Sequence, residues 1–174
     1  MRRSAGRSLP TRSPRSSDGI ATPPTAELVD VIVVADASIL VVALGDDTLV
    51  GQRARDWLVE LSSGAPLSIV RNLTPLEVTS AFRRLAQLGK IDPDFVAAVL
   101  SRFAALPVDR HDLTQPMIAR IWELRGNLTP YDAAYVALLE SLVSERRTAG
   151  VLATTDRKLA GAPGLSVDVH VFPG

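Results

Sequence analysis

The sequence predicts an α/β fold with a mostly parallel central sheet that is flanked by helices on both faces. The first observation is the apolar run at residues 31–35, which contains four β-branched residues and is typical of a strand buried on both sides. The second is that strand-like apolar runs alternate with helical patterns along the chain. The third is composition, because 174 residues with 47% hydrophobic content are enough for one domain with a full core.

The chain begins with a segment of different composition. Residues 1–26 are rich in arginine, serine and proline and contain few apolar side chains, so we expect a disordered tail at 1–26 and one domain at 28–174. The basic start is not followed by the apolar core of a signal peptide, and no stretch reaches the ~20 apolar residues of a membrane helix. The chain also lacks cysteine. We therefore expect a cytoplasmic protein that makes no membrane contact.

The remaining elements follow in order from apolar spacing and from start and stop residues. Helical spacing predicts helices that begin near residues 38, 49, 74, 92 and 129, one around residue 117, and a short one at 156–159. Gly64 and Gly89 are expected to end two of these helices. Short apolar runs predict strands at 67–70, 106–108, 150–154 and 167–172, the last at an edge of the sheet.

Four carboxylates occupy related positions in this pattern. Asp36 and Asp156 follow predicted strands, and each of the other two acids, Glu77 and Asp132, is the third residue after a threonine that starts a helix. In an open parallel sheet these positions lie along one edge, so we expect the four side chains to converge there. Converging carboxylates repel one another unless a cation neutralises them.

A structural interpretation remains open for each acid taken singly. A threonine followed three residues later by an acid is a capping box, and acids are favoured in the first turn of any helix. Asp36 could likewise cap the helix that begins near Ser38. Capping does not account for the shared position of all four acids at one edge of the sheet.

The ligand inventory restricts the cation. The chain has no cysteine and only two histidines, so thiolate sites and histidine-based zinc sites are excluded. Oxygen ligands point to Mg²⁺, with Mn²⁺ as a substitute, and phosphate oxygens of a substrate would complete the coordination. Such a site is typical of phosphodiester hydrolysis. A glycine-rich phosphate loop is missing, and 19 basic against 19 acidic residues do not indicate a broad polyanion-binding surface.

The acidic motifs also carry a family resemblance. The segments Val-Ala-Asp36-Ala-Ser38, Leu-Thr-Pro-Leu-Glu77, Leu-Thr-Pro-Tyr-Asp132 and Leu-Ala-Thr154-Thr-Asp156 resemble, in order, the four acidic motifs of PIN domains. The short single-domain layout over residues 30–174 is similar to VapC-type toxins of type II toxin–antitoxin pairs.

The resemblance implies a PIN-like fold and a Mg²⁺-dependent endoribonuclease that cleaves RNA. It also implies a homodimer that is neutralised by a VapB-like antitoxin. The catalytic and metal-binding residues would be Asp36, Glu77, Asp132 and Asp156. The hydroxyl groups of Ser38 and Thr154 would support the first and last of these acids.

Two alternatives remain at this point. The chain could be a PIN-domain nuclease of RNA processing that has no antitoxin. It could also be a non-catalytic α/β binding module, in which the acids bind a cation or cap helices. Mg²⁺-dependent RNA cleavage separates both nucleases from the binding module, and an adjacent small antitoxin gene separates the two nucleases.

Overall fold

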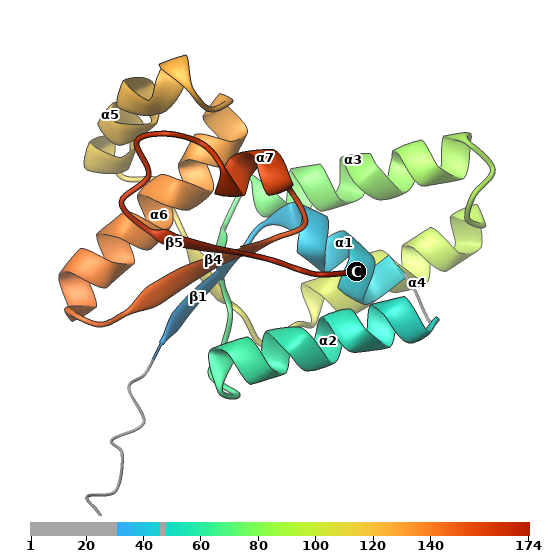
Figure 1. The fold of residues 1–174 in the computed structure, drawn as a ribbon. Helices are drawn as coiled ribbons and strands as arrows, with labels where there is room; N and C mark the ends of the chain where they lie inside the picture. Colours follow the sequence, from blue (N-terminus) through green and yellow to red (C-terminus); the bar gives the residue numbers. More distant parts are fainter. Residues whose placement is uncertain (1–30, 46–47) are drawn as a thin grey trace, which may run out of the picture.

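The computed structural model describes residues 31–45 and 48–174 (Figure 1). The predicted tail at 1–26 lies outside the described residues, as does the start of the predicted domain at 28–30. The described part contains one five-stranded sheet in the order β3-β2-β1-β4-β5, and every neighbouring pair of strands is parallel. The strands are β1 (Ile32–Ala35), β2 (Ser68–Val70), β3 (Asp109–His111), β4 (Gly150–Thr154) and β5 (Asp168–Val171).

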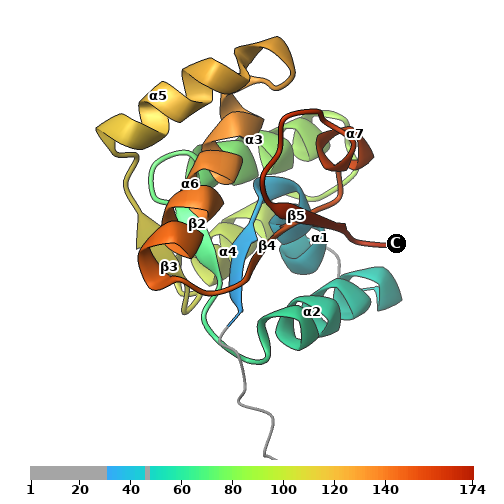
Figure 2. The same ribbon diagram turned by 60° about the vertical axis from the view of Figure 1, so that its left-hand side comes forward.

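Helices cover both faces of this sheet, as predicted. Figure 1 shows α1 to α4 on one side and α5 and α6 on the other, and the turned view in Figure 2 brings α5 and α6 forward, in front of the sheet. The helices on the first side are α1 (Ala37–Gly45), α2 (Leu49–Ser62), α3 (Thr74–Gln87) and α4 (Pro93–Ala104). The others are α5 (Gln115–Glu123), the 3₁₀ turn η1 (Leu124–Gly126), α6 (Pro130–Arg146) and the short α7 (Arg157–Ala160).

Strand β1 supplies side chains to two separate cores because successive residues of a strand point to opposite faces. Val33 and Ala35 pack with residues of α1 to α4, whereas Ile32 and Val34 pack with residues of α5 and α6. All four residues of the strand are buried. The prediction of a central strand covered on both sides is confirmed.

Helix α6 has the longest run of buried residues among the described helices that flank the sheet. Its residues 133–139 are all buried, because this segment lies against the sheet on the second face. The same packing explains Gly150 at the start of β4, where an added Cβ would lie 2.6 Å from Cγ2 of Val143 in α6. A side chain at this position would separate α6 from the sheet.

One predicted strand is displaced along the sequence. The apolar segment 106–108 was expected to form a strand, but the strand is β3, which begins at Asp109. Pro107 has no N–H for a ladder hydrogen bond, and the backbone instead turns, with the N–H of Val108 donating to the carbonyl of Leu106 at 2.9 Å. Within the described ranges, none of the helices combines the length and apolar character needed to span a membrane.

Candidate active site

The sheet topology brings Asp36 and Thr154 together although they are far apart in the sequence. Strands β1 and β4 are neighbours with Ala35 opposite Ala153, so the residue that follows β1 lies beside the last residue of β4. The backbone N–H of Asp36 donates to the carbonyl of Ala153 at 3.0 Å. The hydroxyl of Thr154, a fully buried side chain, donates to Oδ2 of Asp36.

Ser38 completes this hydrogen-bond arrangement. Its backbone N–H donates to Oδ1 of Asp36, so both carboxylate oxygens of Asp36 are engaged. Its hydroxyl oxygen accepts from the N–H of Thr155 at 3.0 Å and lies 3.3 Å from Oγ1 of Thr154. The two hydroxyl residues that the sequence assigned a supporting role therefore lie directly around the first acid.

Asp36 is an unusually placed carboxylate because it is only 6% exposed. Burial raises its pKa above the ordinary value of 3.8, and the hydrogen bonds from Thr154 and Ser38 lower it in part. The negative charge of Asp132 raises the pKa further. The charged form of Asp36 is thus held at an energetic cost within the fold.

Glu77 reaches the same region from the first turn of α3. Its Oε2 accepts a hydrogen bond of 2.6 Å from the hydroxyl of Tyr135, a buried residue of α6. Burial raises the pKa of Glu77, the hydrogen bond from Tyr135 lowers it, and the charges of Asp36 and Asp132 raise it again. Three of the predicted acids therefore act on one another electrostatically.

The capping interpretation holds for Asp132 but not for Glu77. Thr129 is the N-cap of α6: its Oγ1 accepts from the N–H of Asp132 at 3.2 Å and donates to Oδ2 of Asp132 at 2.7 Å. In α3 the N-cap is Leu73, which makes no side-chain capping bond. Glu77 therefore has no capping function, whereas Asp132 combines a capping bond with proximity to two other acids.

Asp156 is connected to the other acids only indirectly. Its Oδ1 accepts from the N–H of Lys158 at 2.7 Å, so its carboxylate caps α7. Its own N–H donates to Oγ1 of Thr154 at 3.0 Å, and Thr154 in turn donates to Asp36. Among the described hydrogen bonds, none joins the carboxylate of Asp156 to Asp36 or Glu77.

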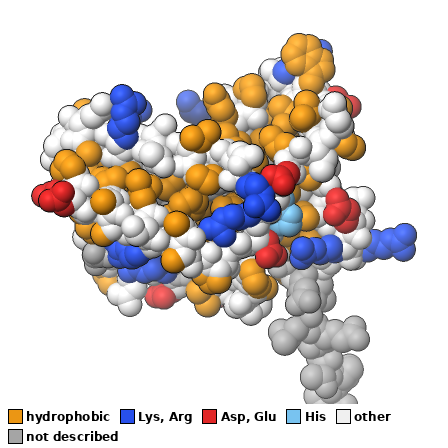
Figure 3. All heavy atoms as spheres, turned by 180° about the vertical axis from the view of Figure 1, so that it is seen from behind, with side chains coloured by type: hydrophobic (Ala, Val, Ile, Leu, Met, Phe, Trp, Pro, Cys, Tyr) orange, Lys and Arg blue, Asp and Glu red, His pale blue; other side chains and the backbone are white. Residues whose placement is uncertain are grey.

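The three interacting acids form a negative cluster without an internal counter-charge. None of the ion pairs between described residues includes Asp36, Glu77 or Asp132. Elsewhere the charges are mixed, and the rear face in Figure 3 shows acidic and basic side chains interspersed among apolar atoms. That face carries no extended basic surface, in agreement with the balanced composition.

The chemistry of this cluster fits a hard divalent cation. Its donors are carboxylate and hydroxyl oxygens, which Mg²⁺ prefers, and the mutual repulsion of the acids would be relieved by a positive ion. Within residues 31–45 and 48–174, no three Asp, Glu or His side chains converge closely enough to hold one ion. Coordination by one or two carboxylates together with water and substrate phosphate, which is usual for Mg²⁺, needs no such triad.

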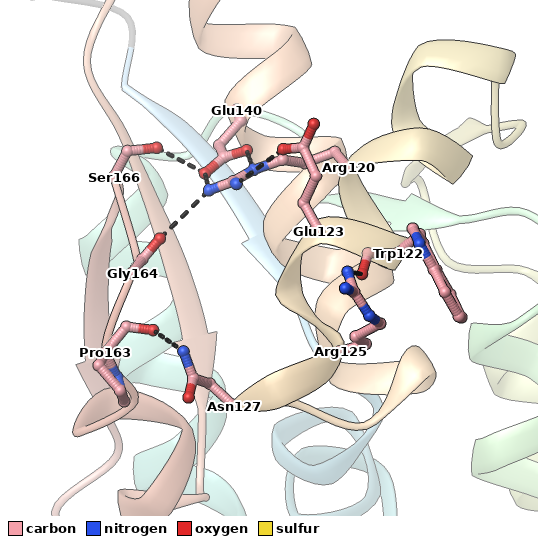
Figure 4. A network of polar contacts seen from close by, with 9 residues as sticks. All are labelled: Arg120, Trp122, Glu123, Arg125, Asn127, Glu140, Pro163, Gly164 and Ser166. Atoms are coloured by element: carbon pink, nitrogen blue, oxygen red, sulfur yellow. Dashed lines mark hydrogen bonds and ion pairs between the residues drawn. The ribbon is translucent and has the colours of Figure 1, made fainter.

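A second polar network fixes the helical hairpin that leads to Asp132. The guanidinium of Arg120 in α5 contacts both oxygens of Glu140 in α6, at 2.7 and 3.0 Å, and donates to the carbonyl of Gly164 at 3.2 Å (Figure 4). The hydroxyl of Ser166 also donates to Glu140. This network ties α5, α6 and the segment before β5 together.

Sequence reasoning missed Tyr135 and Thr74. The hydroxyl oxygen of Tyr135 lies 3.1 Å from Oγ1 of Thr74, which is fully buried. The available signal was that Tyr135 is a polar residue in an otherwise apolar stretch of α6, one helical turn after Asp132.

Comparisons with known proteins identify relatives of this chain. Models of known protein families gave no match. Ribonuclease VapC9 of Mycobacterium tuberculosis is 32% identical over 142 residues, covering 82% of this chain and 99% of that protein. Ribonuclease VapC3 of the same organism is 35% identical over 140 residues, covering 80% and 91%.

A solved structure supports the fold independently. The crystal structure of PAE2754 from Pyrobaculum aerophilum matches with a TM-score of 0.57 and 23% identity, covering 86% of this chain and 92% of that chain. The similarity to the VapC ribonucleases spans nearly their whole length. The chain therefore belongs to the VapC family of PIN-domain ribonucleases.

Proposed function

We propose that the chain is a Mg²⁺-dependent endoribonuclease toxin, with Mn²⁺ as a substitute, that cleaves RNA phosphodiester bonds. The observation that carries the proposal is the cluster of Asp36, Glu77 and Asp132, three acids that disfavour one another's charge and have no cationic partner among the described residues. Proteins retain such unfavourable charge where it serves function. The relatives named ribonuclease VapC supply the substrate class.

Each residue has a distinct role in this proposal. Asp36, oriented by Thr154 and Ser38, and Glu77, oriented by Tyr135, would hold Mg²⁺. Asp132 would contribute through a bound water and through its charge, since the three acids do not converge closely enough to bind one ion directly. When bound, Mg²⁺ activates water as a nucleophile and stabilises the negative charge that develops on the phosphodiester. Asp156 would act through Thr154 and through its cap on α7, without requiring direct contact with the ion.

The proposal includes two protein partners, a second copy of the chain and a VapB-like antitoxin. Apolar side chains are exposed on two helices, with Leu49 and Val59 on α2 and Ile118 and Trp122 on α5. Ile118 and Trp122 lie one turn apart on the same face of α5, and neighbouring exposed apolar side chains are typical of protein interfaces. Light scattering at micromolar concentration should give the mass of a dimer, and a monomer would contradict this part of the proposal.

A cleavage assay on a pool of total RNA tests the main proposal. Wild-type protein should cleave with Mg²⁺ or Mn²⁺ and not with EDTA, and Glu77→Gln should lose at least about 100-fold in rate, as expected for a residue that binds the catalytic metal. Cleavage by Glu77→Gln at the wild-type rate would contradict the assigned site. Complete absence of cleavage by wild type would favour a non-catalytic binding module.

A growth assay separates the toxin from a nuclease of RNA processing. Expression of the wild-type chain should arrest growth, and co-expression of a VapB-like antitoxin from an adjacent gene should restore growth. Glu77→Gln should fail to arrest growth at the same protein level. Mg²⁺-dependent cleavage without growth arrest would favour the RNA-processing function.

A further inference from the structure

Tyr135 is a buried hydroxyl in the middle of an apolar helix, and its partners lie in a different helix. Only 2% of the residue is exposed, and its ring packs in the core that α6 forms with the sheet. Its hydroxyl donates to Oε2 of Glu77 at 2.6 Å and lies 3.1 Å from Oγ1 of Thr74, both in the first turn of α3. A buried tyrosine needs a partner for its hydroxyl, but it does not need one in the acid cluster.

This contact determines how the first turn of α3 faces the other acids. The N-cap residue Leu73 makes no side-chain bond, so α3 lacks the capping that fixes the start of α6. A glutamate side chain has three rotatable bonds and does not hold one orientation unless it is bonded. The hydrogen bond from Tyr135 fixes Oε2 of Glu77, and Oε1 accepts no hydrogen bond from the described residues, so it remains available to a cation.

The position of Tyr135 within α6 ties it to the site. It lies three residues after Asp132, so the two residues occupy the same face of the helix. Helix α6 therefore carries one acid of the cluster and also the group that orients a second. A shift of α6 would move Asp132 and Glu77 together.

We propose that Tyr135 is a positioning residue, whose hydroxyl holds Glu77 in the orientation that binds the divalent cation of the acid cluster. This inference rests on the proposed function, because it takes Glu77 as a metal-binding residue. A purely structural function of Tyr135 would reside in its ring, which fills the core. The substitution Tyr135→Phe keeps the ring, removes the hydroxyl and so separates the two functions.

The test compares Mg²⁺ binding in four variants by thermal melts during a Mg²⁺ titration, a readout that does not depend on activity. Tyr135→Phe should need about 10-fold more Mg²⁺ than wild type for half of the thermal stabilisation, the effect typical of losing a group that orients a metal ligand. Tyr131→Phe is the matched control, since it removes the hydroxyl of the other tyrosine of the chain, which is exposed on the same helix. It should titrate as wild type does.

A double variant shows whether Tyr135 acts through Glu77. If it does, Tyr135→Phe should not weaken Mg²⁺ binding further in a Glu77→Gln protein, because the two changes remove the same interaction. Additive losses would overturn the proposal. Melts in EDTA and circular dichroism establish that each variant is folded. For Tyr135→Phe, cleavage at limiting Mg²⁺ should fall and should recover largely at high Mg²⁺.

The outcomes distinguish failure of this inference from failure of the proposed function. If wild type binds Mg²⁺, Glu77→Gln binds it weakly and Tyr135→Phe titrates as wild type does, the positioning function of Tyr135 is refuted and the nuclease site stands. If wild type shows neither stabilisation by Mg²⁺ nor RNA cleavage, the proposed function is refuted, and the positioning function of Tyr135 is refuted together with it.

Discussion

Replacing Asp36 with asparagine should stabilise the protein when no divalent cation is present. The carboxylate is 6% exposed, and its raised pKa shows that burial outweighs the hydrogen bonds from Thr154 and Ser38. Hydrogen bonds to a charged group contribute about 1.5–3 kcal/mol each, while a buried charge loses several kcal/mol of hydration. Asparagine removes the charge and keeps an oxygen that accepts from the N–H of Ser38.

The expected gain is about 1 kcal/mol in the free energy of unfolding, the balance of these opposing contributions. For a domain of this size, 1 kcal/mol corresponds to a rise in Tm of roughly 2–4 °C. Thermal melts of Asp36→Asn and wild type in EDTA at neutral pH measure this difference in Tm. Added millimolar Mg²⁺ should raise the Tm of wild type more than that of the variant and so narrow or reverse the difference.

The dependence on pH has a defined sign. The pKa of Asp36 is higher in the folded protein than its ordinary value of 3.8. The contribution of such an acid to the free energy of unfolding is most favourable at pH values below the ordinary pKa, and it is lost as the pH rises through the pKa of the folded state. The advantage of Asp36→Asn over wild type should therefore be full at neutral pH. It should shrink as the pH falls toward 3.8, where the wild-type carboxyl group is also uncharged.

The substitution Asp92→Asn is a matched control for the general effect of removing one negative charge. Asp92 is the exposed N-cap of α4, with Oδ1 accepting from the N–H of Asp94 at 2.8 Å. Asparagine caps a helix about as well as aspartate, so Asp92→Asn should change Tm little in either condition. Lower melting of Asp36→Asn in EDTA, together with no Mg²⁺ response of wild type, would refute the metal-cluster reasoning and leave Asp36 as a structural acid.

Three further predictions concern the surroundings of the cluster. Thr154→Val should lower the free energy of unfolding by about 1–3 kcal/mol in a denaturant titration, because Asp36 loses a donor and the N–H of Asp156 loses an acceptor. Asp156→Asn should reduce the rate of RNA cleavage by only about 10-fold, because Asp156 supports the site indirectly through Thr154. Asp36→Asn should reduce the rate by at least about 100-fold. Equal losses in the two variants would show that Asp156 takes part directly. Glu140→Gln should lower stability by about 1–2 kcal/mol, since Arg120 loses the more buried of its two charged partners and keeps only the exposed Glu123. Burial opposes ionisation of Glu140, but the hydrogen bond from Arg120 holds the pKa of Glu140 below the ordinary 4.5. Thermal melts should therefore show the lower stability of Glu140→Gln at neutral pH. The difference from wild type should disappear once the pH has fallen below the pKa of Glu140 in the folded protein.

The two Leu-Thr-Pro motifs show what the sequence could and could not predict. Both were expected to begin helices that carry an acid in the first turn, and both do. Thr129 caps its helix, whereas Thr74 lies inside the helix and contacts Tyr135 instead of capping. The difference arises from tertiary packing of α3 against α6, which no local pattern encodes. Tyr135 was missed for the same reason, because its partner Glu77 is 58 residues away in the chain.

The central strand was predictable because it depends on local information alone. A continuous β-branched run identifies a strand buried on both faces, and parallel topology then places the following acid at the carboxyl edge. The exact convergence of the acids depends on the order of strands in the sheet and on hydrogen bonds between distant residues. Thr154 lies against Asp36 because β4, rather than β3 or β5, is the neighbour of β1.

The pairing of β1 with β4 has a consequence for biosynthesis. A ribosome makes Asp36 early, but the strand that supplies Thr154 is made only near the end of translation. Until β4 pairs with β1, Asp36 lacks the hydroxyl that orients it, and closing so long a stretch of chain is entropically slow. A nascent chain that still lacks β4 therefore cannot hold Asp36 in the orientation that the complete fold gives it. If the proposed function holds, truncated translation products that lack β4 should cleave RNA poorly.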